Sequence, residues 1–294
     1  FKEQMLADNL ESLILLKTLN PFAEKNIGDL YYELHEKKWE VYVVTEIDKT
    51  AWPTGTGIIK AGLHPNKIEE YKNKYQNNWK DILLREFRSA VFEYEKTRRQ
   101  IDDSKEETSK EIIVKEERLR EFASSFVGDL QVNVGDIISF PVLQIHSLRH
   151  GIKVIEFQTP HYERLILMFS QKVITQNYWD TDEAISKMET EIYHPPKLSC
   201  IHNTKYLNVE RFADFPQFNF DRIRMEPKSS YEKKLKGKYQ LLIIISGSAK
   251  VVSQTGNSIN LKAKESLFLP LGMRSYRINS IGNNQLICLS ATPK

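Results

Sequence analysis

Two histidines and two glutamates in strand-like surroundings have the chemistry of a divalent-metal site. Glu33 and His35 lie two positions apart, and Glu40 follows shortly after them. His146 stands far along the chain. Neutral imidazoles and carboxylates are ligands that zinc, manganese, iron and cobalt all accept, and three protein ligands with one open position are typical of a catalytic site. These residue types therefore indicate Lewis-acid chemistry on a substrate that offers oxygen atoms.

The expected local structure would bring these side chains within reach of one metal ion. Side chains alternate along a strand, so Glu33 and His35 point to the same face. The segments on either side of residues 36–39 are rich in Tyr and Val and predict a hairpin, in which His35 and Glu40 are cross-strand partners. Directly opposed Cβ atoms lie about 5 Å apart in such a pair. His146 would add a ligand from a separate strand.

Each of these residues also has an ordinary structural interpretation. A histidine and a glutamate on a hairpin are more often a polar pair than metal ligands. His64 is a rival ligand, although its Gly-Leu-His-Pro setting is typical of a turn. Lys38 suits a solvated turn or a phosphate contact, and Arg164 could equally be a structural ion-pair partner. The metal interpretation therefore depends on His146 and on the run that follows it, up to Gln158.

A long segment without Gly or Pro predicts a helical insertion at about residues 66–126. Trp79, Leu83, Phe87 and Val91 recur in it at helical spacing, which predicts an amphipathic helix with one buried face. Lys, Arg and Glu are mixed on the remaining positions. Mixed charge of this kind is typical of a solvated face rather than of a nucleic-acid surface.

Short strands are predicted on both sides of this insertion. Alternating and β-branched segments separated by Gly and Pro dominate before it and again after Gly128. Residues 176–200 are polar and contain Pro195-Pro196, which favours a linker. Short strands return in residues 201–294, at intervals typical of a second sandwich or barrel. The pattern predicts a mainly β protein with an α insertion.

The candidate site residues lie in segments that resemble the type I mannose-6-phosphate isomerases, a family of the cupin group of jelly-roll proteins. The matching segments are Glu33-Leu34-His35 at the family's Gln-x-His, Lys38-Trp39-Glu40 at its Lys-x-Glu, Pro141 to His146 at its Pro-to-His spacing, and Gly151 to Gln158 at its Gly-x-x-x-x-Glu-x-Gln run. The likeness covers roughly residues 11–175. Glu33 departs from the family pattern by replacing a Gln, and the loop between His35 and Glu40 is shorter.

The resemblance implies a division into two cupin-like jelly-roll domains. The first would span residues 1–175, carry the active site and include the insertion at 66–126. Residues 176–200 would link it to a C-terminal cupin-like β-domain at 201–294. The C-terminal part shares only a fold-level likeness with the family.

The resemblance also implies a function, a metal-dependent interconversion of mannose 6-phosphate and fructose 6-phosphate with zinc as the expected ion. His35, Glu40 and His146 would be the ligands, with Glu33 as a fourth. The catalytic candidates are Arg164 for developing negative charge, Lys38 for the phosphate or the sugar oxygens, and Glu156 as a base or as a support for a ligand. The alternatives are an inactive cupin that acts as a sugar-binding or regulatory module, and a purely structural cupin assembly.

Composition narrows the remaining function classes. A length of 294 residues is enough for one large or two moderate domains, and a net charge of +3 is too small to favour nucleic acid or an anionic membrane. No apolar run approaches the length of a membrane helix. Two cysteines form no disulfide framework, so a reducing cytoplasm is the expected compartment. A small sugar phosphate is the expected partner, and nothing in the sequence indicates an oligomeric state.

Overall fold

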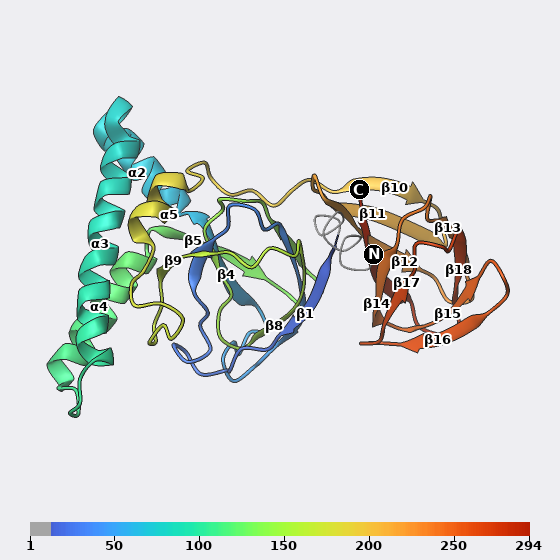
Figure 1. Ribbon diagram of the computed structural model, residues 1–294, viewed down its shortest axis with the longest axis horizontal. Helices are drawn as coiled ribbons and strands as arrows, with labels where there is room; N and C mark the ends of the chain where they lie inside the picture. Colours follow the sequence, from blue (N-terminus) through green and yellow to red (C-terminus); the bar gives the residue numbers. More distant parts are fainter. Residues whose placement is uncertain (1–12) are drawn as a thin grey trace, which may run out of the picture.

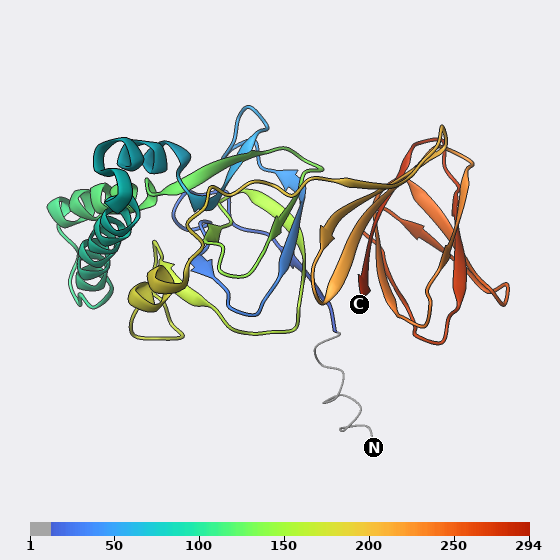
Figure 2. The same ribbon diagram turned by 90° about the horizontal axis from the view of Figure 1, so that it is seen from above.

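The computed structural model describes residues 13–294 and confirms a mainly β protein with a helical insertion. Two β-domains lie side by side along the long axis, and the helices of the insertion lie at the far end of the first domain (Figure 1, Figure 2). None of the helices in this range has the length and apolar character needed to span a bilayer.

The first β-domain is built from two sheets that face each other. The four-stranded sheet has the order β1 (Leu15–Leu19), β8 (Ile152–Gln158), β3 (Glu40–Ile47) and β6 (Ile137–Phe140). The five-stranded sheet has the order β5 (Val127–Val132), β4 (Gly57–Leu63), β7 (His146–Ser147), β2 (Tyr32–Leu34) and β9 (Leu165–Met168). Side chains that point between the sheets fill the barrel, and those that point outward are free to pack on other elements.

The helical insertion connects β4 to β5 and covers the outer face of the five-stranded sheet. Its helices are α2 (Pro65–Tyr75), η2 (Gln76–Asn78), α3 (Trp79–Asp102) and α4 (Lys110–Ser124). Leu83, Phe87 and Val91 of α3 are buried in one cluster with Leu165 and Leu167 of β9. The stripe seen in the sequence is thus the buried face of a helix, as its spacing requires.

The second β-domain is also a pair of sheets. One has the order β10 (Ser199–Asn203), β11 (Leu207–Asp214), β12 (Phe218–Met225), β19 (Leu286–Pro293), β14 (Gln240–Ser246) and β17 (Ser266–Leu269). The other has the order β13 (Ser230–Lys234), β18 (Ser275–Ser280), β15 (Ser248–Ser253) and β16 (Ser258–Lys262). Its interior is an apolar cluster that includes Ile223, Tyr276 and Cys288.

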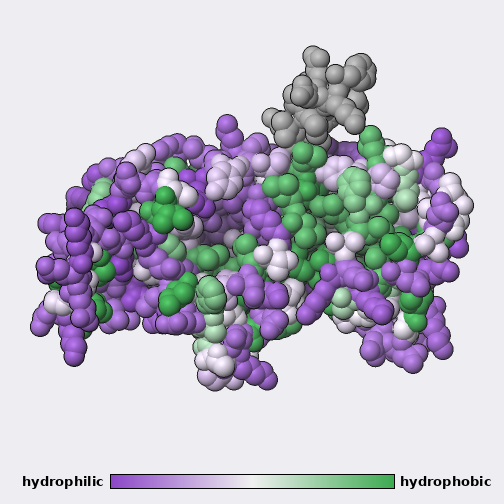
Figure 3. Space-filling model, turned by 60° about the horizontal axis from the view of Figure 1, so that its bottom comes forward, coloured by the Kyte–Doolittle hydropathy of each residue, from purple (hydrophilic) through white to green (hydrophobic). Residues whose placement is uncertain are grey.

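The two β-domains share an apolar cluster of their own. Val41 and Phe157 of the first domain are buried with Phe212, Phe220 and Leu289 of the second. Phe157 and Phe220 approach with ring centroids 4.9 Å apart. Figure 3 shows hydrophobic side chains gathered on the face over this junction and the adjoining second domain.

Two connections between strands differ from their expected structure. The predicted hairpin around residues 36–39 is wrong, because β2 and β3 belong to different sheets and the chain crosses from one sheet to the other between them. The expected linker at 176–200 contains α5 (Thr181–Lys187) and leads into β10. The division into 1–175, 176–200 and 201–294 stays a prediction.

Candidate metal centre

Three of the candidate ligands lie together inside the first barrel. Glu33 of β2 and His146 of β7 are directly paired across their antiparallel strands. Tyr32 and Leu34 belong to the cluster under the helices, so alternation turns Glu33 toward the barrel interior. One ligand atom from each of Glu33, His35 and His146 lies within 4.8 Å of the others.

Glu40 reaches the same place from the facing sheet. Its Oε2 lies 2.9 Å from Nε2 of His146, and its Oε1 lies 3.6 Å from Nε2 of His35. Oε1 of Glu33 lies 3.8 Å from the same nitrogen of His35. The structure thus groups Glu33, His35 and His146 within reach of one ion and places Glu40 beside both histidines, through a crossing connection rather than a hairpin.

The donor atoms at this point fit a divalent cation. Within residues 13–294, Oε2 of Glu33 and Nε2 of His35 are buried without a hydrogen bond. The two oxygens of Glu40 have only Lys38 and His146 as polar neighbours, at 2.5 and 2.9 Å. A buried polar atom left unpaired costs about 1–3 kcal/mol. Two imidazoles and two carboxylates aimed at one point are a suitable ligand set for zinc, manganese, iron or cobalt.

Both histidines are oriented by carbonyl oxygens behind them. Nδ1 of His35 lies 2.7 Å from the carbonyl oxygen of Glu163, and Nδ1 of His146 lies 2.9 Å from that of Gln144. A carbonyl oxygen only accepts, so Nδ1 carries the proton in each neutral ring. Nε2 is then the lone-pair nitrogen and faces the site, as a metal-ligating histidine requires.

Charge is balanced locally by Lys38. Its Nζ lies 2.5 Å from Oε1 of Glu40, whose side chain is fully buried, whereas that of Lys38 is 11% exposed. Burial alone would raise the pKa of Glu40, but Lys38 and the two imidazoles hold that pKa well below its usual value. Burial would lower the pKa of Lys38, yet Glu40 and Glu33 raise it above its usual value. Both groups are therefore ionised at neutral pH.

The two imidazoles respond differently to the same surroundings. Burial lowers the pKa of His35, which favours the neutral ligand form. Burial acts on the pKa of His146 in the same direction, but the adjacent Glu40 carboxylate outweighs it and raises that pKa. A cation on Glu40 would remove this effect, because the carboxylate charge would then be shared with the metal.

Glu33 and Glu40 line a cavity of about 180 Å³, together with Lys38, Glu156 and Arg164, and the two histidines lie behind Glu40. Burial and the neighbouring Glu40 carboxylate raise the pKa of Glu156 to about 9, so this carboxyl group is protonated at neutral pH. The Arg164 guanidinium stacks over Tyr31, 4.6 Å from its ring centroid. All seven residues singled out in the sequence thus line or adjoin one cavity.

His64, the rival ligand, lies elsewhere. Its Nδ1 accepts a hydrogen bond from the backbone N–H of Asn66 at 3.2 Å and caps the start of α2. A side chain engaged as a helix cap has a structural role there. His64 therefore takes no part in the metal centre.

Glu163 is the site residue that sequence reasoning missed. Its carboxylate accepts hydrogen bonds from the backbone N–H groups of Glu36, Lys37 and Lys38, at 3.0, 2.8 and 3.0 Å. Its carbonyl oxygen also orients His35. Burial would raise the pKa of Glu163, but the three N–H donors lower it below its usual value. No motif in the sequence marks Glu163. Only the general rule that the N–H groups of a partly buried loop need acceptors indicates that some residue must take this role.

Comparison with known proteins gives the fold but no sequence family. No family model matches the chain, and no curated protein matches it by sequence. The mannose 6-phosphate isomerase of Bacillus subtilis is 12% identical with a TM-score of 0.61, over 95% of this chain and 74% of that one. A zinc-bound mannose 6-phosphate isomerase is 13% identical with a TM-score of 0.64, over 97% and 81%. A variant of Salmonella typhimurium phosphomannose isomerase is 12% identical with a TM-score of 0.64, over 99% and 81%. The likeness shows a shared fold.

Proposed function

We propose that this chain is a divalent-metal-dependent aldose–ketose isomerase of the type I mannose-6-phosphate isomerase family, which interconverts mannose 6-phosphate and fructose 6-phosphate. The observation that carries this proposal is the gathering of two carboxylates and two imidazoles, from Glu33, His35, Glu40 and His146, with the buried Oε2 of Glu33 and Nε2 of His35 left without a hydrogen bond among the described residues. Glu33 and Glu40 line a cavity whose wall also contains the protonated Glu156 and three cations, Lys17, Lys38 and Arg164. A zinc-bound isomerase among the proteins of this fold supports zinc as the ion.

The four ligands would hold the cation so that it supplies Lewis-acid polarisation of the oxygens on C1 and C2 of the sugar. The rearrangement moves one hydrogen between these carbons and one proton between their oxygens. Glu156 is placed for the second transfer, because it is buried in the cavity wall and carries a proton at neutral pH. It can give that proton to one sugar oxygen and regain a proton from the other.

Two cations are placed to act on negative charge. Arg164 lines the cavity and stacks on the ring of Tyr31, with its guanidinium carbon 4.6 Å from the ring centroid. A guanidinium fixed in this way stabilises charge that develops on a substrate oxygen without reorganising. Lys38 remains protonated beside Glu40 and can orient the sugar oxygens.

A sugar-binding module without catalysis is the second candidate, and one observation favours it. The Lys38 ammonium already provides a counter-ion for Oε1 of Glu40. A buried carboxylate neutralised in this way needs no metal to remain ionised. Metal content and proton exchange distinguish the two candidates.

The test combines metal content after purification without added metal with isomerase activity on mannose 6-phosphate. Chelation should abolish activity and added divalent metal should restore it. His146→Ala should remove metal and activity together, because one imidazole ligand is lost. Arg164→Ala should lower kcat about 10²-fold with metal content unchanged. The exposed residue Lys250 on β15 provides the control, Lys250→Ala, which should change neither.

One result would overturn the catalytic proposal in favour of the binding module. It is a metal-loaded protein that binds the sugar phosphate without exchanging hydrogen at C1 or C2.

A further inference from the structure

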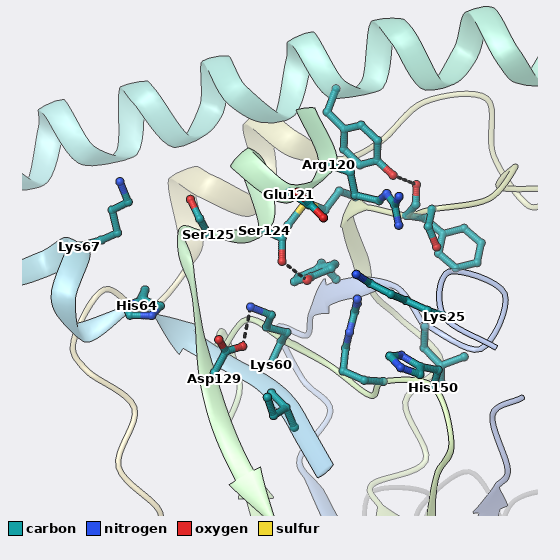
Figure 4. Close-up of a pocket in the computed structure, with 18 of the residues that line it drawn as sticks. Lys25, Lys60, His64, Lys67, Arg120, Glu121, Ser124, Ser125, Asp129 and His150 are labelled. Atoms are coloured by element: carbon teal, nitrogen blue, oxygen red, sulfur yellow. Dashed lines mark hydrogen bonds and ion pairs between the residues drawn. The ribbon is translucent and has the colours of Figure 1, made fainter. Parts of the chain in front are cut away.

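A second and larger cavity lies outside the first barrel, between the five-stranded sheet and the helical insertion. It has a volume of about 520 Å³, within the range of small-molecule sites. Its walls come from β4, β5, the start of α2, the end of α4 and the turn at Arg149 and His150. Figure 4 shows polar side chains from these elements pointing toward one another around it.

This cavity is separate from the metal centre, because β2 lies between the two. Tyr32 of β2 lines the outer cavity, whereas its neighbour Glu33 lines the inner one. Alternation along the strand accounts for this division. The same holds at β7, where His146 faces the ligands and Ser147 lies beside Arg149, with 3.4 Å between Oγ and Nη1.

In two ion pairs of the lining the cation is more buried than the acid. The side chain of Lys60 is 13% exposed, whereas its partner Asp129, 2.6 Å away, is 45% exposed. Lys67 is 25% exposed and its partner Glu70 is 57% exposed. Glu121, the third acid of the lining, is exposed. Ion pairs with an exposed carboxylate are worth about 0–1 kcal/mol, so these acids can turn to water at little cost.

Two arginines also line the cavity, Arg149 and Arg120. Arg149 donates to Oδ2 of Asp29, and the other carboxylate oxygen accepts from the backbone N–H of His150 at 3.0 Å and lies 2.7 Å from its Nδ1. This buried carboxylate therefore holds the guanidinium and the imidazole in place. Arg120 faces the Glu116 carboxylate at 3.5 Å, and its buried Nε makes no hydrogen bond within residues 13–294, whereas the neighbouring Arg98 is paired with Asp102 at 2.7 Å.

Lys25 completes the cation set. It lines the cavity and has no ion-pair partner among the described residues. Figure 4 shows its side chain extending over the space in front of Ser124 and Lys60. An unpaired ammonium beside several inward-facing cations produces a local field that attracts an anion.

Aromatic rings also line the cavity and give it an apolar wall. Trp52 stacks on His150, with ring centroids 4.9 Å apart and planes inclined by 21°. Tyr32 and Phe169 also line the cavity. Rings of this kind bind the flat or apolar part of a ligand whose charged end meets the cations.

We propose that this outer cavity binds a small organic phosphate, with the phosphate group among Lys25, Lys60 and Arg120 and the organic part against the aromatic wall. Several lysine and arginine donors around one space suit the oxygens of a phosphate group. The site does not depend on the metal centre, because none of Glu33, His35, Glu40 and His146 lines it.

Calorimetric titration of the chelator-treated full chain with phenyl phosphate tests this proposal, since the probe joins a phosphate to one aromatic ring. The wild-type protein should bind it with a Kd in the millimolar range or tighter. Lys25→Glu should weaken binding about tenfold, because an exposed ammonium becomes a carboxylate facing the phosphate. Arg120→Met should also weaken it. Lys250→Glu, on an exposed position of the second domain, should leave the Kd unchanged.

The two cavities are distinguished by a further variant. Lys38→Met alters only the metal-centre cavity, so it should not change the Kd for phenyl phosphate. Loss of binding in Lys38→Met with full binding in Lys25→Glu would place the phosphate in the inner cavity and overturn the proposal. A wild-type protein that does not bind the probe at millimolar concentration would overturn it as well.

Discussion

Asp29 shows how one buried carboxylate can fix two neighbouring side chains. It is 2% exposed and holds both Arg149 and His150. Burial would raise its pKa, but His150 and Arg149 lower it from 3.8 to about 2. A lowered pKa means that the ionised form is stabilised by folding, by about 2 kcal/mol at neutral pH. This stability is complete above the unfolded pKa and is lost as pH falls from 3.8 toward 2.

We therefore expect Asp29→Asn to lower the free energy of unfolding by about 2 kcal/mol at pH 7 and by much less near pH 2. Urea denaturation at the two pH values measures the difference. Asp103→Asn is the matched control, because Asp103 is 75% exposed and should change stability by less than about 0.5 kcal/mol. Equal urea midpoints for Asp29→Asn and the wild-type protein at pH 7 would contradict the role assigned to Asp29.

At the scale of single elements, the crossing between β2 and β3 determines the geometry of the metal centre. The chain between His35 and Glu40 carries both residues to the site from different sheets. Its N–H groups are held by the Glu163 carboxylate, and its His35 carbonyl accepts from the N–H of Leu143 at 2.6 Å. The loop is thus anchored by residues far along the chain, not by its own turn.

Replacing Glu163 should therefore weaken metal binding without removing a ligand. Glu163→Ala should reduce zinc affinity about 10–100-fold, since residues that orient metal ligands have effects of this size. Glu163→Gln should fall between, because one amide oxygen can still accept. Competition with a chromophoric chelator measures the affinity. Glu36→Gln is the control, because that carboxylate pairs with the exposed Lys187. Wild-type affinity in Glu163→Ala would show that the loop holds its shape without this acceptor.

This loop also shows where sequence reasoning ends. The helix of Leu83, Phe87 and Val91 was predictable because its signal is local and periodic. The inward orientation of Glu33 was predictable too, because side chains alternate along a strand. A hairpin and a crossing connection look alike over ten residues, however. The difference depends on Glu163, whose partner loop lies about 125 positions away.

At the scale of the whole molecule, the contact between the two β-domains couples their stability. Short strands and turn residues predicted the mainly β class, but not which sheet faces which, because Phe157 and Phe220 are far apart in sequence. Phe220 of β12 pairs with Ala291 of β19, the strand that also carries Cys288. A substitution that weakens the packing at the junction should therefore also lower the stability of the core of the second domain.

Cys288 reports on that core. It is fully buried, and burial raises its pKa to about 12, so its thiol is unreactive in the folded protein. Cys200 is exposed, and serine at that position leaves Cys288 as the single thiol of the chain. In a Cys200→Ser background, Cys288 should react with an aromatic disulfide reagent at pH 8 only when the second domain opens.

Phe220→Ala in that background should speed the reaction about 100-fold. Removing a buried phenyl ring costs about 3–5 kcal/mol, and part of this loss appears as easier opening of the sheet that holds Cys288. Phe268→Ala is the matched control, because Phe268 lies in the same sheet but is 58% exposed and should leave the rate near that of the parent. The absorbance of the released thiolate gives both rates. Similar rates for the two variants would mean that the junction contributes nothing to the second domain, and that the two β-domains are held together by the chain alone.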